Sequence, residues 1–345
     1  MSGPVRDDAR RVDERPRRAV PRGAVPIGLI VVGIAVAASL PFWLLTSQFA
    51  IGIAIRVLVF ASIAVSWGLL AGYGGQVSFG HAAFFGLGAY TTALLFVDFR
   101  ITPWLGMWAG VGVALIGAFV IGIPSFRLRG IFFSLATFAF SLILQTVFTY
   151  FQRITGGDVG VSLPLLGNRP EFFEFDGLSA YYYFGLVLLA ATIAAVYVFM
   201  RSRLGLYLLA IRDSHEAAES LGVNTTSVKM AALMVSASAC ALAGALYVGY
   251  TYFIDPNSAF GVGVSLQIAL LGIAGGLNTI WGPALGSAVL IPVGEYLNST
   301  IGSNHAGVQL IIYSLVLIVI ILLLPQGMAE GLTRLYRVGR RLARR

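Results

Sequence analysis

The stretch GYGGQVSFGHAAFFGLGAY, residues 72–90, interrupts two long apolar runs with glycine. Gly72, Gly74 and Gly75 disfavour an unbroken helix, because each glycine costs about 1 kcal/mol relative to alanine in a helix interior. The apolar runs on either side, residues 50–70 and 78–97, have the length of about twenty residues that a helix needs to cross a bilayer. The stretch therefore predicts two membrane-spanning helices joined by irregular backbone.

The composition of the whole chain agrees with a membrane protein. Of its 345 residues, 58% are hydrophobic and only 11% are charged, less than half of the usual soluble share. A soluble fold of this size could not bury so much apolar surface. A transmembrane β-barrel would alternate polar and apolar residues along each strand, and these runs do not. The predicted fold class is an all-α, polytopic transmembrane helix bundle.

Apolar runs of this kind recur along residues 26–325 and predict about ten spans. The first run could instead be a signal peptide, but it continues past Ala37-Ala38-Ser39 to Leu45, which favours a retained helix. Residues 152–180 form the longest predicted outer loop, either a solvated connector or a landing surface for a soluble partner. The ten expected spans are 26–45, 50–70, 78–97, 103–123, 130–151, 181–200, 228–251, 263–277, 281–298 and 306–324.

The basic residues predict the orientation of the bundle. All 23 except Lys229 are arginine, and with ten spans nineteen of them fall on one side of the membrane and three on the other. The positive-inside rule therefore places both termini in the cytoplasm. Residues 1–25 are predicted to be a disordered basic arm, and residues 326–345 a basic tail. We find no basic patch interleaved with aromatic residues, so no nucleic-acid partner is predicted.

The glycine-rich break has two interpretations. Irregular backbone at membrane depth persists only where it is buried in protein or lines a wet cavity, and a helix that begins at Ser78 would direct unpaired N–H groups at a carboxylate. A second Gly-Gly segment, residues 271–282, resembles the first, and paired interruptions mark translocation sites in some transporters. The alternative is a tight turn at the cytoplasmic surface. The candidate substrate-path residues are Gly74, Gly75, Gln76, Ser78, His81 and Asn278. No histidine or carboxylate stands at metal-binding spacing from His81, so no metal is predicted.

A short polar segment, residues 204–222, separates two apolar runs and contains HEAAESLG at residues 215–222. Helical spacing predicts one amphipathic helix that ends at Gly222, with caps for the next span at residues 224–227. Small Ala217 and Ala218 would fit a groove of another protein, with charges beside them as a rim. A helix lying flat in the lipid headgroups is the alternative, and its acids argue against that. The apolar residues that fall on one face of this helix are Leu204, Leu208, Ile211, Ala218 and Leu221.

Here the sequence resembles a known family. EAA-x-x-x-G, Glu216 to Gly222, looks like the coupling loop of permeases in ATP-binding-cassette importers, although the Ile-x-Leu-Pro continuation is absent. Together with residues 72–90, 210–223 and 269–290, it makes the chain from about 50 to 325 similar to LivM-type permeases of branched-chain amino acid importers. The resemblance implies ATPase coupling through Arg212, Glu216, Ala217, Ala218 and Gly222.

The resemblance also implies an assembly in the bacterial inner membrane. Such permeases pair with a second, related permease, bind two cytoplasmic ATPase subunits that hold the ATP, and receive solute from an extracytoplasmic binding protein. This chain would itself carry no cofactor. The same branch includes importers of urea and short amides, and the sequence does not choose among these solutes.

Other classes of function are disfavoured. A phosphate-binding loop needs Gly-Lys-Ser/Thr, but the only lysine, Lys229, lies between Val228 and Met230. We find no arrangement of residues that would make the chain a membrane enzyme. An ion-coupled secondary transporter would place ionisable groups inside the spans. Few are present, namely Arg56, His81 and Glu295, so this class is disfavoured but left open.

Overall fold

The computed structural model describes residue 33 and residues 35–41, 47–302, 307–324 and 326–331. The predicted arm, residues 1–25, lies outside the described residues, as does the tail from residue 332 onward. Of the first predicted span, residue 33 and residues 35–41 are described, and they are helical.

Within the described residues, seven helical segments are long and apolar enough to cross a membrane. They are α2 (Gln48–Gly68) continued by the π-helical turn η1 (Leu69–Tyr73), α3 (His81–Phe99), α4 (Pro103–Ser125), α5 (Ile131–Tyr150), α7 (Leu178–Arg201), α10 (Thr225–Thr251), and α11 (Pro256–Phe260) with α12 (Val262–Gly275). The chain is therefore an all-α, polytopic helix bundle, as predicted.

Two of the predicted spans are shorter in the structure. The helices α13 (Gly282–Leu297), followed by the π-helical turn η4 (Asn298–Gly302), and α14 (Val308–Leu323) have 16 residues each. The strands β1 (Val161–Ser162) and β2 (Phe253–Ile254) pair antiparallel and tie the loop that follows α5 to the end of α10. The remaining short elements are α6 (Gln152–Thr155), η2 (Gly157–Val159), η3 (Pro170–Phe172), α8 (Arg203–Asp213) and α9 (His215–Ser220).

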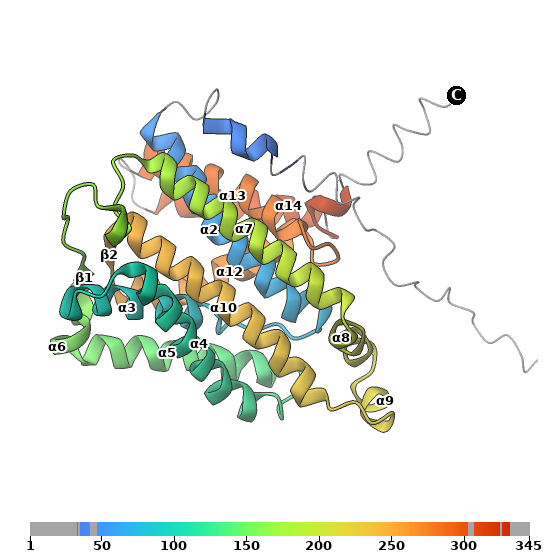
Figure 1. Ribbon diagram of the computed structural model, residues 1–345. Helices are drawn as coiled ribbons and strands as arrows, with labels where there is room; N and C mark the ends of the chain where they lie inside the picture. The colour runs from blue at the N-terminus through green and yellow to red at the C-terminus, as the bar shows by residue number, and fades with distance from the viewer. Residues whose placement is uncertain (1–32, 34, 42–46, 303–306, 325, 332–345) are drawn as a thin grey trace, which may run out of the picture.

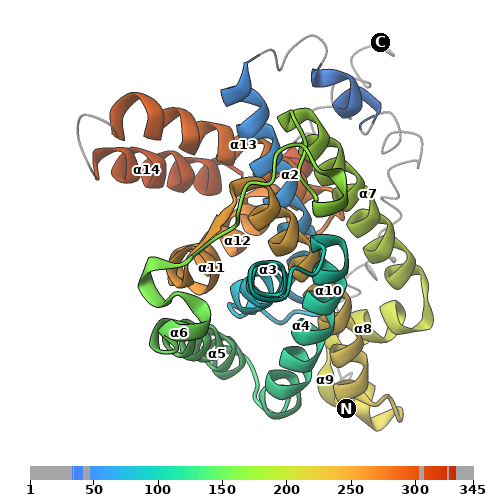
Figure 2. The same cartoon turned by 60° about the vertical axis from the view of Figure 1, so that its left-hand side comes forward.

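The core is built on a close crossing of α3 and α10. A Cβ atom at Gly88 would lie 2.2 Å from the Ala241 carbonyl oxygen, and one at Gly244 would lie 2.0 Å from the Phe85 carbonyl oxygen. Only glycine permits this backbone contact, which is the usual way in which membrane helices pack. Figure 2 looks along α3 and shows α4, α10, α11 and α12 around it.

The bundle has two distinct ends (Figure 1). We call the end that carries α8 and α9 the α9 end, and the end that carries β1, β2 and α6 the strand end. Between them, α5 lies at the margin, and only its residues Phe133, Thr137 and Ser141 are buried. Its other face is largely apolar and exposed, as expected for a helix in contact with lipid.

The break after α2 differs from the prediction in one detail. The helix α3 begins at His81 with Gly80 at its N-cap, so the expectation that Ser78 caps a new helix was wrong. The Ser78 hydroxyl instead accepts a hydrogen bond from the Gly80 N–H at 3.2 Å. This local bond competes with helix formation, and the helix starts three residues later.

Candidate functional site

Residues 74–80, which we call the glycine loop, are fastened to two helices. The Trp67 indole N–H of α2 donates to the Ser78 carbonyl oxygen at 2.6 Å. From α5, the Ser134 hydroxyl donates to the Val77 carbonyl oxygen at 2.6 Å, and the Thr137 hydroxyl accepts from the Phe79 N–H at 3.1 Å. These bonds satisfy backbone groups that irregular structure would otherwise leave unpaired, so the loop is held in one conformation.

The polar residues predicted beside this break have packing partners or are half-buried. The His81 Nε2 atom lies 2.7 Å from the Ser236 hydroxyl, which links α3 to α10, and the His81 side chain is 1% exposed. Ser78 is also buried. Gln76 is half-buried, and its buried Oε1 has no hydrogen-bond partner among the described residues.

The two predicted groups of site residues contact each other at the α9 end. A Cβ atom at Gly75 would lie 3.1 Å from Cγ of Arg212, and one at Gly74 would lie 3.2 Å from Cδ1 of Leu208. Both side chains belong to α8. The glycine loop therefore lies against α8 at the end of the bundle, which is the position that the turn alternative predicts.

The second glycine break lies beside the first. A Cβ atom at Gly72 would lie 2.6 Å from the Leu277 carbonyl oxygen, and one at Gly68 would lie 3.4 Å from Pro283. Leu277 belongs to the turn between α12 and α13, where Gly276 has φ +109° and Asn278 is exposed. The weak resemblance between the two segments thus corresponds to a contact between them.

The predicted continuous helix over residues 204–222 is two helices, α8 and α9, so that prediction was wrong. Ser214 is extended (φ −156°, ψ 111°), and its hydroxyl accepts from the Ala217 N–H at 3.3 Å. This side-chain cap starts a new helix. The predicted ending is confirmed: Gly222 has φ +81°, and the Val223 N–H donates to the Ala218 carbonyl oxygen at 3.1 Å, as in a Schellman motif.

The break at Ser214 also changes which residues face outward. The five residues predicted to share one apolar face do not share one environment: Leu208 and Ile211 are buried, but Leu204 is exposed, and Leu221 is 84% exposed. Ala218, predicted to meet a partner, is 2% exposed and packs within the chain. Helical spacing counted across a break does not keep residues on one face.

The outer surface of α9 is small and charged. Glu216 and Ala217 are exposed, and the Glu216 carboxylate accepts from Arg129 at 2.9 Å. Both side chains of this pair are mostly exposed, so it contributes at most about 1 kcal/mol and either partner is able to exchange it for another. Burial, followed by the positive charge of Lys229, lowers the pKa of His215 beneath this surface.

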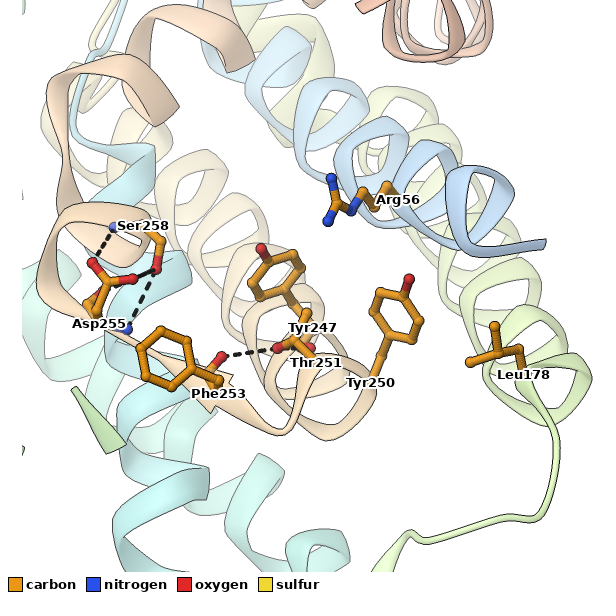
Figure 3. A pocket seen from close by; sticks show the side chains of 8 residues that line it. All are labelled: Arg56, Leu178, Tyr247, Tyr250, Thr251, Phe253, Asp255 and Ser258. Carbon is orange, nitrogen blue, oxygen red and sulfur yellow. Dashed lines mark hydrogen bonds between the residues drawn. The ribbon is translucent and has the colours of Figure 1, made fainter. Parts of the chain in front are cut away.

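A polar pocket of about 470 Å³ lies at the strand end (Figure 3). None of the predicted substrate-path residues lines it. Arg56 was predicted only as an intramembrane charge, and the other seven lining residues were not predicted. Six of them lie within residues 247–258, and the fold brings Arg56 and Leu178 to that segment. The lining residues are Arg56, Leu178, Tyr247, Tyr250, Thr251, Phe253, Asp255 and Ser258.

Comparison with known proteins places these features in a family. The family described as "Branched-chain amino acid transport system / permease component" matches residues 49–324, from the start of α2 to the end of α14. The chain belongs to this family. All the predicted site residues lie within the matched range.

The relatives are permease proteins of transport systems. The chain is 25% identical over 278 residues to the high-affinity branched-chain amino acid transport system permease protein LivM of Salmonella typhimurium, covering 74% of this chain and 65% of that protein. It is 23% identical over 286 residues to the corresponding permease protein LivH of Escherichia coli K12, covering 78% and 90%. It is also 27% identical over 209 residues to the nucleoside ABC transporter permease protein NupC of Lactococcus lactis, covering 55% and 63%.

The chain thus spans just under two thirds of the length of the LivM proteins that it matches. No solved structure matches it. Family membership and the seven long apolar helices identify a multi-pass inner-membrane protein of a transport family.

Proposed function

We propose that the chain is the transmembrane permease subunit of an ATP-binding-cassette importer, forming the translocation path for branched-chain amino acids. Separate ATPase subunits bind ATP and grip the exposed surface of α9. The observation that carries the proposal is the contact between α8 and the glycine loop, because it joins an exposed helix pair to the bundle interior. The names of LivM and LivH supply the solute class.

The charges support the orientation that this function requires. Basic residues gather around the α9 end, and the positive-inside rule places such an end in the cytoplasm, where ATP is. Arg129 beside Glu216 belongs to this group. Three arginines instead lie at the strand end, namely Arg100, Arg153 and Arg169. The basic residues of the α9 end are Arg127, Arg129, Arg201, Arg203, Arg212 and Lys229.

Further subunits complete the proposed assembly. The chain is similar both to LivM and to LivH, two different permease proteins of branched-chain amino acid transport systems, and this supports a second, related permease beside it. Two ATPase subunits would occupy the α9 end, and an extracytoplasmic binding protein would dock at the strand end, where the loop between α5 and α7 lies. The chain itself would carry no cofactor.

The proposal is tested by uptake of labelled leucine into vesicles that contain the assembled complex, with urea, a short amide and a nucleoside as competing solutes. We expect Glu216→Lys and Ala217→Trp to abolish ATP-driven uptake, since both alter the exposed surface of α9, while the protein stays folded and inserted. Asp98→Lys, which reverses an exposed acid near the end of α3 and outside the loop between α5 and α7, is the matched control and should leave ATPase coupling intact.

Two results would contradict the proposal. Unchanged uptake with normal ATPase stimulation in both α9 variants would remove the coupling role. Loss of uptake on adding an ionophore, with ATP held constant, would instead indicate an ion-coupled secondary transporter.

A further inference from the structure

The pocket at the strand end gathers opposite charges from separate elements (Figure 3). Arg56 comes from α2, Tyr247 and Tyr250 from α10, and Asp255 from the N-cap of α11. Its volume of about 470 Å³ lies within the usual range for small-molecule sites, roughly 300–1,000 Å³. The pocket opens at the strand end and brings an arginine and an aspartate to one site, which is the arrangement that a ligand with both charges requires.

Arg56 supplies a fixed positive charge on one side of the pocket. Its guanidinium forms an ion pair with Glu295 of α13, a residue that does not line the pocket. A guanidinium has five N–H donors, so one carboxylate does not use them all. The side chain is 38% exposed. Glu295 thus holds one end of the Arg56 guanidinium, which lines the pocket with further N–H donors, and a planar guanidinium is well suited to bind a carboxylate.

Asp255 supplies a fixed negative charge on the other side. One carboxylate oxygen accepts from the N–H groups of Asn257 and Ser258 at 2.9 Å and 3.0 Å, and the other accepts from the Ser258 hydroxyl at 2.6 Å. These bonds hold the carboxylate in place. An ionised carboxylate has about four acceptor positions, so capacity for an ammonium group remains.

Two tyrosines lie between these charges. In Figure 3 the Tyr247 ring stands between Arg56 and Asp255, with Tyr250 beside it. Among the lining residues drawn in Figure 3, neither tyrosine hydroxyl forms a hydrogen bond, so both are able to bind a ligand. Leu178 and Phe253 add apolar surface to the same pocket.

We propose that this pocket binds a small zwitterion with an apolar side chain, namely an amino acid. The ligand's carboxylate lies on Arg56 and the Tyr247 hydroxyl, its ammonium lies on Asp255, and its side chain lies against Phe253, on the Asp255 side of the pocket in Figure 3. This inference rests on the proposed transport function and adds a solute site at the strand end, away from the glycine loop. Uncharged urea would form neither ion pair, and a nucleoside lacks both charges.

The test measures binding of tritiated leucine to the complete permease–ATPase complex in nanodiscs, with the binding protein left out. Arg56→Gln, Tyr247→Phe and Asp255→Asn should each weaken leucine binding about tenfold or more, because each removes a charge or a hydroxyl from the site. Asparagine caps helices as well as aspartate does, so Asp255→Asn keeps the start of α11. Arg153→Gln and Tyr150→Phe, both exposed, are the matched controls and should bind leucine normally.

Two further arms separate recognition from structure. The charge exchange Arg56→Glu with Glu295→Arg restores the ion pair between α2 and α13 but places a carboxylate in the pocket, so leucine binding should stay lost. Competition should require both charges: 4-methylpentanoate, without the ammonium, and isoamylamine, without the carboxylate, should each compete at least about tenfold more weakly than leucine.

Several results would overturn the proposal. These are leucine binding that the charge exchange restores, binding unaffected by all three pocket variants, no binding to the unsubstituted complex, and equal competition by urea or a nucleoside. Each variant is first checked for co-purification with the ATPase subunits. Failure of the proposed function would appear there, as a complex that never forms, and not as altered solute preference.

Discussion

Gly75 has a positive φ angle and also lies in contact with Arg212 of α8. Its φ of +67° is a conformation that L side chains rarely adopt, and the side chain of Arg212 occupies the space next to it. The glycine loop and α8 therefore fit together only when this position has no side chain. At the residue scale, this is the contact through which we expect a displacement of α8 to reach the bundle.

We expect Gly75→Val to lower ATP-driven uptake about tenfold with the ATPase subunits still bound. A β-branched residue in this conformation costs about 1–3 kcal/mol, and it also displaces Arg212. Gly112→Val, on α4 with nothing within 4 Å of its Cβ position, is the control and should transport normally. Normal uptake by the Gly75 variant would show that the loop does not transmit movement.

Single residues were predictable from sequence where the signal is local. Gly222 and Asn224 punctuate the chain by themselves, and the structure confirms both, with the Asn224 side chain accepting from the Ser227 N–H at 3.0 Å. Ser78 could not be read in this way, because the Trp67 indole and α5 fix the loop around it through tertiary contacts. Six of the eight pocket residues lie within residues 247–258, but only the fold brings Arg56 and Leu178 to them, so the segment by itself did not indicate a pocket.

At the scale of elements, α9 is too short to be stable alone, since isolated helices need about 12–15 residues even in favourable sequences. Its cap at Ser214, its Schellman ending and the buried Ala218 hold it in place. The spacing of apolar residues located the long spans correctly. It did not reveal the break between α8 and α9 at Ser214, because apolar residues on both sides of the break keep helical spacing. The result is two short helices instead of one rod.

We expect Ser214→Ala to destabilise α9 by about 1 kcal/mol, because the N-terminal N–H groups of the helix lose their cap. Amide hydrogen exchange over residues 215–222 should rise about fivefold, and ATPase coupling should weaken with it. Ser220→Ala is the matched control, since that hydroxyl donates to the Glu216 carbonyl oxygen and caps nothing. Equal exchange in the two variants would mean that Ser214 does not define the element.

At the scale of the whole molecule, α2 joins the two ends. Its outer part carries Arg56 of the pocket, and its inner part carries Trp67, which holds the glycine loop. Arg56 and Tyr73, at the end of the η1 turn that continues α2, are about 25 Å apart at 1.5 Å per residue. Because α2 also packs against the second break through Gly68 and Gly72, a displacement at α8 reaches both glycine breaks together. We therefore expect α2 to connect the exposed helices α8 and α9 to the polar pocket at the strand end.

The most direct test of this account is site-specific photocrosslinking in the complete complex. A photoreactive residue at position 221 replaces the 84% exposed Leu221 beside α9, and one at position 159 replaces the 82% exposed Val159 at the strand end. We predict that position 221 crosslinks to an ATPase subunit, with a yield that changes when ATP is added, and that position 159 does not. Absence of an ATPase crosslink from position 221, or an ATPase crosslink from position 159, would contradict the account.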